Sequence, residues 1–72
     1  MKYVIDAARL TTKEESHAYL KELFAFPEYY GGNLDALRDC LDEIGELEIK
    51  WANEGAHGSY YSRVKKVIDQ IK

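Results

Sequence analysis

Four carboxylates at helical spacing are the side chains of this chain whose types and positions best suit chemistry. Asp35, Asp39, Asp42 and Glu43 follow one another at short intervals. A rotation of about 100° per residue puts all four on one side of a helix. The opposite side then carries apolar residues, namely Leu34, Leu37, Cys40, Leu41 and Ile44. Carboxylates so placed can act as general acid and base, hold a cation, or bind basic groups of a partner.

Two of these chemistries do not suit a single exposed helix. A hydrolase needs a cleft that holds substrate and gives its two carboxylates different environments. Calcium needs about six to eight oxygens wrapped around it, which one helix face cannot supply. His57 and Ser59 lie near each other in the sequence, but no acid is placed to complete a catalytic triad. We therefore expect no enzyme activity, no cofactor and no metal site.

Charge is concentrated around these carboxylates. Residues 27–43 hold five acids and one base, Arg38, whereas the other residues of the chain hold eight acids and nine bases. Like charges four residues apart, as at Asp35 and Asp39, each cost a helix about 0.2–0.5 kcal/mol. Because the chain keeps these repulsive pairs despite their cost, we interpret the carboxylates as a surface for a basic partner and not merely as a solvated helix face. With no basic patch, we expect no direct contact with nucleic acid.

The loop before this helix offers a second kind of contact. Tyr29 combines a large rigid ring with a hydroxyl, which suits the centre of a protein interface. Tyr30 either shares that surface or fills the core beneath the turn. Gly31 and Gly32 provide the turn, and Asn33 is a good N-cap for the acidic helix.

Five elements must position these residues, in the order strand, helix, helix, strand, helix. One strand is expected at 3–5, a short apolar run, and the other at 47–51, where apolar and charged residues alternate. Capping boxes at Thr11 and Thr12 begin the first helix, which ends before Pro27. The second helix runs from Asn33 to about Ile44 and ends at Gly45. After a polar loop over 53–58, Ser59 is expected to cap the last helix.

This order predicts one α/β domain over residues 1–72, in which a small parallel sheet of two strands packs against about three helices. Cys40 lies on the apolar side of its helix and is expected to be buried. A lone cysteine without a secretory signal predicts a reducing, cytoplasmic location. The N-terminal apolar run is too short to cross a membrane, so no membrane partner is expected.

The run Pro-Glu-Tyr-Tyr-Gly-Gly-Asn-Leu-Asp-Ala-Leu-Arg-Asp-Cys-Leu, residues 27–41, closely resembles the barstar family, whose members inhibit ribonucleases of the barnase type. The resemblance covers most of the chain. It implies a small parallel sheet with packed helices, and 1:1 inhibition by the second helix and the preceding loop. The contact positions that it implies are Tyr29, Gly31, Leu34, Asp35 and Asp39, with Asp39 placed where the enzyme binds a substrate phosphate.

We add four neighbours to this expected partner-binding set: Asn33, Arg38, Asp42 and Glu43. Arg38 stands where the family commonly has tryptophan, so it should change the fit to a partner. The alternatives are an immunity protein against a different toxin with a basic active site, and an acidic adaptor module that binds no enzyme.

The end of the chain departs further from the family. The family uses acids of its last helix for binding, whereas the last helix here carries Arg63, Lys65 and Lys66. The resemblance also implies an additional helix before the last one and a final strand, and we expect neither within these 72 residues. Since an unpaired strand edge invites association, we expect a monomer in the complex and a homodimer through the first strand when free.

Overall fold

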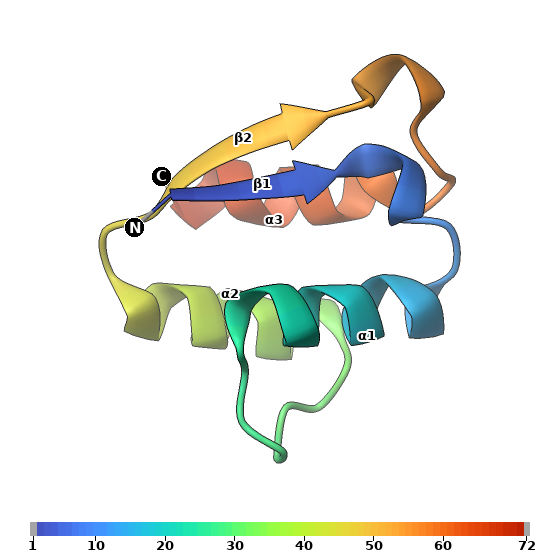
Figure 1. Cartoon of the computed structure of the whole chain (residues 1–72). Helices are drawn as coiled ribbons and strands as arrows, with labels where there is room; N and C mark the ends of the chain where they lie inside the picture. Colours follow the sequence, from blue (N-terminus) through green and yellow to red (C-terminus); the bar gives the residue numbers. More distant parts are fainter. Residues whose placement is uncertain (1, 72) are drawn as a thin grey trace.

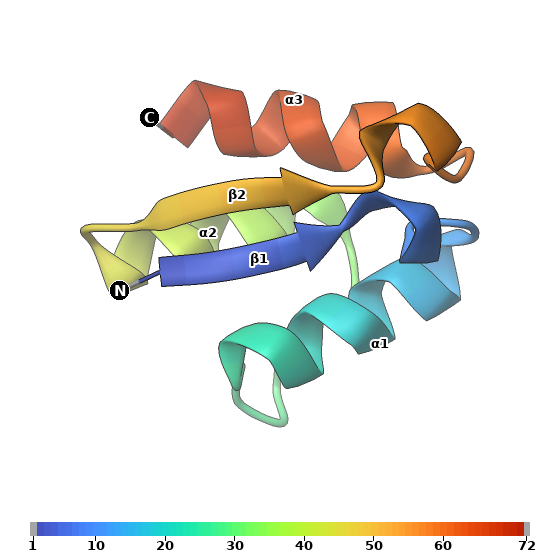
Figure 2. The same ribbon diagram turned by 45° about the horizontal axis from the view of Figure 1, so that its top comes forward.

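The computed structural model describes residues 2–71, within which a two-stranded parallel sheet is covered on one face by three helices (Figures 1 and 2). The elements in chain order are β1 (Lys2–Asp6), η1 (Ala7–Arg9), α1 (Lys13–Phe24), α2 (Leu34–Ile44), β2 (Glu48–Ala52), η2 (Glu54–Ala56) and α3 (Tyr61–Ile71). The predicted α/β class and order of helices and strands are confirmed. The two short 3-10 helices, η1 and η2, are additional to the predicted elements.

The two faces of the sheet differ in exposure. Tyr3 pairs with Ile49 and Ile5 with Trp51 across the parallel ladder, and these side chains point toward the helices. Val4 points to the other face and is 53% exposed. This alternation follows from the period of two along a strand. Within residues 2–71, β1 pairs only with β2, so its outer edge has no strand neighbour.

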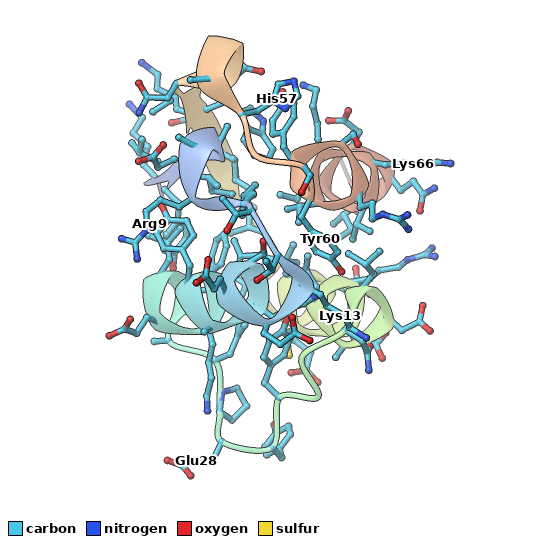
Figure 3. The ribbon with its side chains drawn as sticks, turned by 90° about the vertical axis from the view of Figure 1, so that its right-hand side faces the viewer. Arg9, Lys13, Glu28, His57, Tyr60 and Lys66 are labelled. Atoms are coloured by element: carbon cyan, nitrogen blue, oxygen red, sulfur yellow. The ribbon has the colours of Figure 1, made fainter. Side chains whose placement is uncertain are left out.

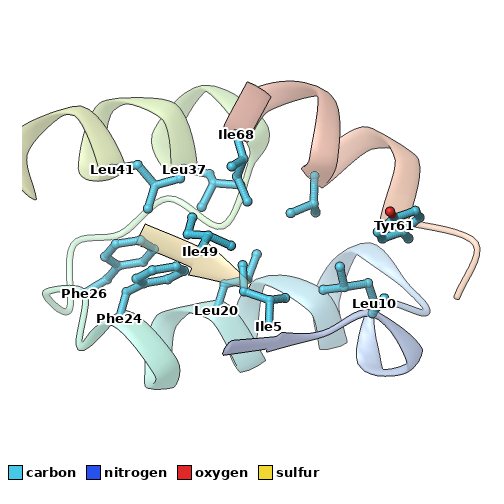
Figure 4. Packing of buried hydrophobic residues seen from close by; sticks show 12 residues of the cluster. Ile5, Leu10, Leu20, Phe24, Phe26, Leu37, Leu41, Ile49, Tyr61 and Ile68 are labelled. Atoms are coloured by element: carbon cyan, nitrogen blue, oxygen red, sulfur yellow. The ribbon is translucent and has the colours of Figure 1, made fainter. Parts of the chain in front are cut away.

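The core lies between the sheet and the helices, and both strands, η1 and all three α-helices contribute to it (Figure 4). Its fully buried apolar side chains are Ile5, Ala7, Leu10, Leu20, Leu37, Leu41 and Val64. Phe24 and Phe26 stack with ring centroids 5.3 Å apart and cover one end. Among the helices within residues 2–71, none has the length and apolar composition needed to cross a bilayer.

The first helix begins with a capping arrangement slightly different from the predicted box. The Thr12 hydroxyl accepts from the backbone N–H of Glu15 at 3.1 Å, as expected for an N-cap. The Glu15 carboxylate, however, accepts from the Thr11 hydroxyl at 2.7 Å. The two threonines therefore share one glutamate, which joins the incoming chain to the first turn of α1.

α1 ends before Pro27, as predicted, at a left-handed residue that the sequence did not reveal. Ala25 has φ 56° and ψ 45°, and the Phe26 N–H bonds to the Lys21 carbonyl at 2.9 Å. This is the hydrogen bonding of a Schellman end, although alanine replaces the usual glycine. The reversal turns Phe26 into the core and sends the chain toward the loop that precedes α2.

The prediction that Ser59 caps the last helix is wrong. α3 begins at Tyr61, and the Ser59 hydroxyl donates instead to the Thr11 carbonyl at 2.7 Å. Two backbone bonds run beside it, from Gly58 to Ala7 and from Tyr60 to Leu10. The segment that leads into α3 is thus bound to the segment between β1 and α1, and these long-range bonds use Ser59 as a tie rather than a cap.

Each helix runs antiparallel to the strands (Figure 1). The N-terminal ends of all three helices therefore gather at the end of the molecule where both strands finish. In open α/β sheets, this is the end at which ligands and partners usually bind. The loop over residues 25–33 projects beside it, below α1 and α2 in the view of Figure 1.

Candidate partner-binding site

α2 separates its side chains as the pattern predicts. Leu37 and Leu41 are fully buried, and Leu34, Cys40 and Ile44 pack against the core. The opposite side exposes all four predicted carboxylates, those of Asp35, Asp39, Asp42 and Glu43. We call these four residues the acidic face. It exists because apolar residues at helical spacing fix the rotation of the helix on the core.

The charges of the acidic face are free to meet a partner. Arg38 is exposed among them, yet within residues 2–71 neither it nor any of the four carboxylates forms an ion pair. The ion pairs of this part of the chain lie elsewhere, at Lys2–Glu48 and Lys65–Glu54. The four carboxylates are therefore not neutralised by ion pairs, and they can attract a basic surface.

The N-terminal end of α2 joins this face to the loop. Asn33 accepts from the Ala36 N–H at 2.8 Å and so caps the helix, as predicted. Gly32 has φ +66°, a left-handed conformation that glycine adopts at no steric cost. Gly31 is exposed, and a Cβ built there would lie 3.5 Å from the Ala36 Cβ. Gly32 thus allows the chain to turn tightly where it enters the helix, whereas a Cβ at Gly31 would make only ordinary van der Waals contact.

The two tyrosines of the loop have opposite roles. Tyr29 is 80% exposed, which fits its predicted place on the surface. Tyr30 points inward, and its ring lies 4.8 Å from that of Phe26. Its backbone N–H also bonds to the Pro27 carbonyl at 3.0 Å, which closes a tight turn. The alternative in which Tyr30 fills the core beneath the turn is the observed one.

His17 holds this loop from beneath. Its side chain is only 3% exposed, with Nδ1 hydrogen-bonded to the Tyr30 hydroxyl at 2.5 Å and Nε2 to the Tyr60 hydroxyl at 3.0 Å. A neutral imidazole has one donor and one acceptor nitrogen, which these two hydroxyls satisfy together. We call His17, Tyr30 and Tyr60 the histidine bridge. It joins α1, the loop and the start of α3.

The surroundings keep the bridge uncharged. Burial lowers the pKa of His17, and the positive charge of Lys13 one turn earlier lowers it further. Burial likewise raises the pKa of the Tyr30 hydroxyl above its ordinary value, with smaller contributions from Cys40 and Tyr60. Both groups are therefore neutral near pH 7, which suits a hydrogen-bonded anchor and not a proton-transfer site.

The sequence holds one signal for the position of His17 and none for its partners. The signal was its spacing of three residues before Leu20, on the apolar side of α1. The partners lie 13 and 43 residues away, so only the tertiary fold brings them together.

Cys40 lies on the apolar side of α2, as predicted, but it is half-buried and not fully buried. Burial raises the pKa of its thiol, and the nearby carboxylates of Glu43 and Asp39 raise it further. A protonated thiol is a poor nucleophile, so Cys40 serves as a small apolar side chain. Within the described residues, no group of three or more His, Cys, Asp or Glu side chains could hold a metal ion.

Comparison with known proteins agrees with this geometry. Residues 1–67 match a family model described as Barstar (barnase inhibitor). A protein of Bacillus subtilis (strain 168), named "Putative ribonuclease inhibitor YrdF", is 50% identical over 77 aligned positions, which cover 99% of this chain and 85% of that protein.

Proposed function

This chain belongs to the barstar family, and on that premise we propose that it inhibits a barnase-type ribonuclease by covering the enzyme's basic active site in a 1:1 complex. The observation that carries the proposal is the acidic face, with four exposed carboxylates that have no ion-pair partner within residues 2–71. The loop that leads into α2 adds the exposed ring of Tyr29. The chain acts as an inhibitor and carries out no reaction of its own.

The acidic face inhibits because it resembles the charge of RNA without its scissile bond. A ribonuclease must hold phosphates with cationic side chains, and carboxylates accept the same charge-assisted hydrogen bonds. Asp39 lies four residues from both Asp35 and Glu43, in the middle of the acidic face. We place its carboxylate in the enzyme's phosphate position, with the other acids meeting cations around it.

The loop contributes shape and preorganisation. Tyr29 offers a broad exposed ring where a base of the substrate would otherwise stack. The neighbouring Tyr30 is fixed by the histidine bridge and by its contact with Phe26. A loop already ordered before binding loses less conformational entropy in the complex, which strengthens association.

Inhibition of RNA cleavage by barnase tests this proposal, with Asp39→Ala as the decisive variant. The natural chain should inhibit at nanomolar to micromolar concentration, and Asp39→Ala should weaken inhibition roughly ten- to hundredfold, because a hydrogen bond to a charged group contributes about 1.5–3 kcal/mol. Glu22→Ala is the matched control, since it removes an exposed acid from α1 instead. Equal inhibition by both variants would contradict the proposal.

The exposed Arg38 favours one alternative, in which the chain is an immunity protein against a different toxin with a basic active site. Its exposed cation interrupts the acidic face and would repel one cation of the enzyme. An immunity protein against a different toxin with a basic active site would show no inhibition of barnase, and Arg38→Trp would not restore it. Inhibition that appears or strengthens with Arg38→Trp would show that Arg38 adjusts specificity within the ribonuclease class.

We also propose that the free chain associates through the outer edge of β1, which has no strand neighbour within residues 2–71. The acidic face lies on α2 and not on this strand edge, so each copy of the chain can still bind one enzyme molecule. Light scattering at rising concentration should show dimers, and a monomer throughout would refute this association.

A further inference from the structure

A hollow adjoins the acidic face where the first turns of all three helices meet. Its volume is about 610 Å³, and its lining residues are Lys13, Asn33, Leu34, Asp35, Tyr60 and Arg63. Figure 3 looks onto this end of the molecule and shows Lys13 and Tyr60 between the helices. Three of the lining residues, Asn33, Leu34 and Asp35, also belong to the proposed partner-binding set. The hollow is therefore continuous with that surface.

The hollow has the opposite charge to the acidic face. Lys13 and Arg63 are both exposed, and within residues 2–71 neither forms an ion pair. Their charges are felt inside the molecule, since Lys13 lowers the pKa of His17 and Arg63 moderates the rise in the pKa of Tyr60. Asp35 is the one acid in the lining. The net charge of the hollow is thus positive.

Stability does not explain these two cations. Lys13 is the first residue of α1, and Arg63 lies in the first turn of α3. A positive side chain near a helix N-terminus interacts unfavourably with the helix dipole. Both residues cost their helices some stability, and both border the surface proposed to meet the enzyme. Asp42 and Glu43 are likewise unfavourable to the dipole of α2, because they are negative charges in its last turn.

We propose that Lys13 and Arg63 select a ribonuclease that presents an aspartate or glutamate beside its basic active site, and that this carboxylate enters the hollow. The proposal rests on the proposed function and narrows its partner. An enzyme that is basic throughout would bring like charges against Lys13 and Arg63 and desolvate them unpaired, which disfavours binding. An acid at that place would pair with both cations while the enzyme's basic groups meet Asp39.

A charge-reversal experiment with barnase tests the pairing. Each lysine and arginine around the enzyme's active site is changed in turn to glutamate. Because such a change can abolish RNA cleavage, calorimetry measures the dissociation constant of each enzyme variant with the natural chain, with Lys13→Glu and with Arg63→Glu. Lys66→Glu is the matched control, because Lys66 is exposed on α3 but lines a different hollow. At one enzyme position, we expect the natural chain to bind the glutamate variant about tenfold more tightly than Arg63→Glu does, as for one charge-assisted contact.

The outcomes separate this inference from the proposed function. If no enzyme position shows coupling above about twofold with Lys13 or Arg63, while Asp39→Ala still loses inhibition, the inference is wrong and the proposed function stands. If the natural chain inhibits none of the enzymes, the proposed function fails and the inference fails with it. Arg63→Glu places a favourable charge in the first turn of α3, so its thermal midpoint should be equal or higher. That midpoint shows whether the variant is folded when it is assayed.

Discussion

The imidazole of His17 and the hydroxyl of Tyr30 meet at 2.5 Å, although 13 residues separate them in the chain. This contact anchors the loop that presents Tyr29, because Tyr30 is the next residue. On its other side, the same imidazole reaches Tyr60 at the start of α3. One buried side chain thus fixes the loop relative to two helices and sets where the exposed tyrosine stands.

Removing the Tyr30 hydroxyl should weaken both folding and inhibition. In Tyr30→Phe, His17 Nδ1 loses its partner in a buried place, which costs about 1–3 kcal/mol of unfolding free energy. The loop also becomes more mobile, so inhibition of barnase should weaken by more than the decrease in the folded fraction explains. Urea unfolding and inhibition measured on the same samples check both effects.

Tyr29→Phe is the control, since Tyr29 is exposed and its hydroxyl has no bond in the structure within residues 2–71. An equal loss of stability in Tyr29→Phe would show that the bridge is not responsible.

The histidine bridge predicts a pH dependence of stability. The folded pKa of His17 is lowered, whereas the unfolded side chain has its ordinary pKa of 6.5. The unfolded state therefore binds more protons in the window between those two values. Stability from this group is fully present above the unfolded pKa and is lost as pH falls through that window to the folded pKa. The cause is burial first and the Lys13 charge second.

Urea unfolding of the natural chain and His17→Gln between about pH 5 and pH 8 measures this contribution. Glutamine can bond to both hydroxyls but does not titrate. The difference in unfolding free energy between the two proteins should change with pH, and the natural chain should lose more stability on the acid side. A difference that is constant over the whole range would contradict the assignment.

Gly58 should be far less tolerant of substitution than Gly55. A Cβ at Gly58 would lie 2.2 Å from the Leu10 carbonyl oxygen, whereas one at Gly55 meets nothing within 4 Å. Gly58→Ala must push apart the segments that lead into α1 and α3, which should cost at least about 1–3 kcal/mol. Gly55→Ala should change stability little. Thermal unfolding of the two variants checks this, and similar midpoints would show that these segments are not packed as described.

The local part of the fold could be predicted because its causes lie close together in the sequence. Thr12 and Asn33 cap α1 and α2, Gly45 follows α2, and the alternation at Ile49 and Trp51 gives β2. The acidic face followed from helical spacing alone, since four acids on one side and apolar residues on the other leave a single rotation of α2.

The tertiary contacts could not be predicted because they join residues far apart in the chain. Ser59 has the chemistry of a cap, but the unpaired Thr11 carbonyl 48 residues earlier takes its hydroxyl. Ala25 adopts a left-handed conformation that its side chain does not favour, because the Schellman bonds and the burial of Phe26 outweigh that preference. The hollow between Lys13 and Arg63 likewise needs three helix ends to be brought together first.

The most direct test of the central claim is an activity titration of barnase with the natural chain at enzyme concentrations well above the dissociation constant. RNA cleavage should fall linearly and reach its end point at one inhibitor molecule per enzyme, and Asp39→Ala should no longer give a sharp end point. Full enzyme activity at a tenfold excess of folded natural chain would contradict 1:1 inhibition of this enzyme.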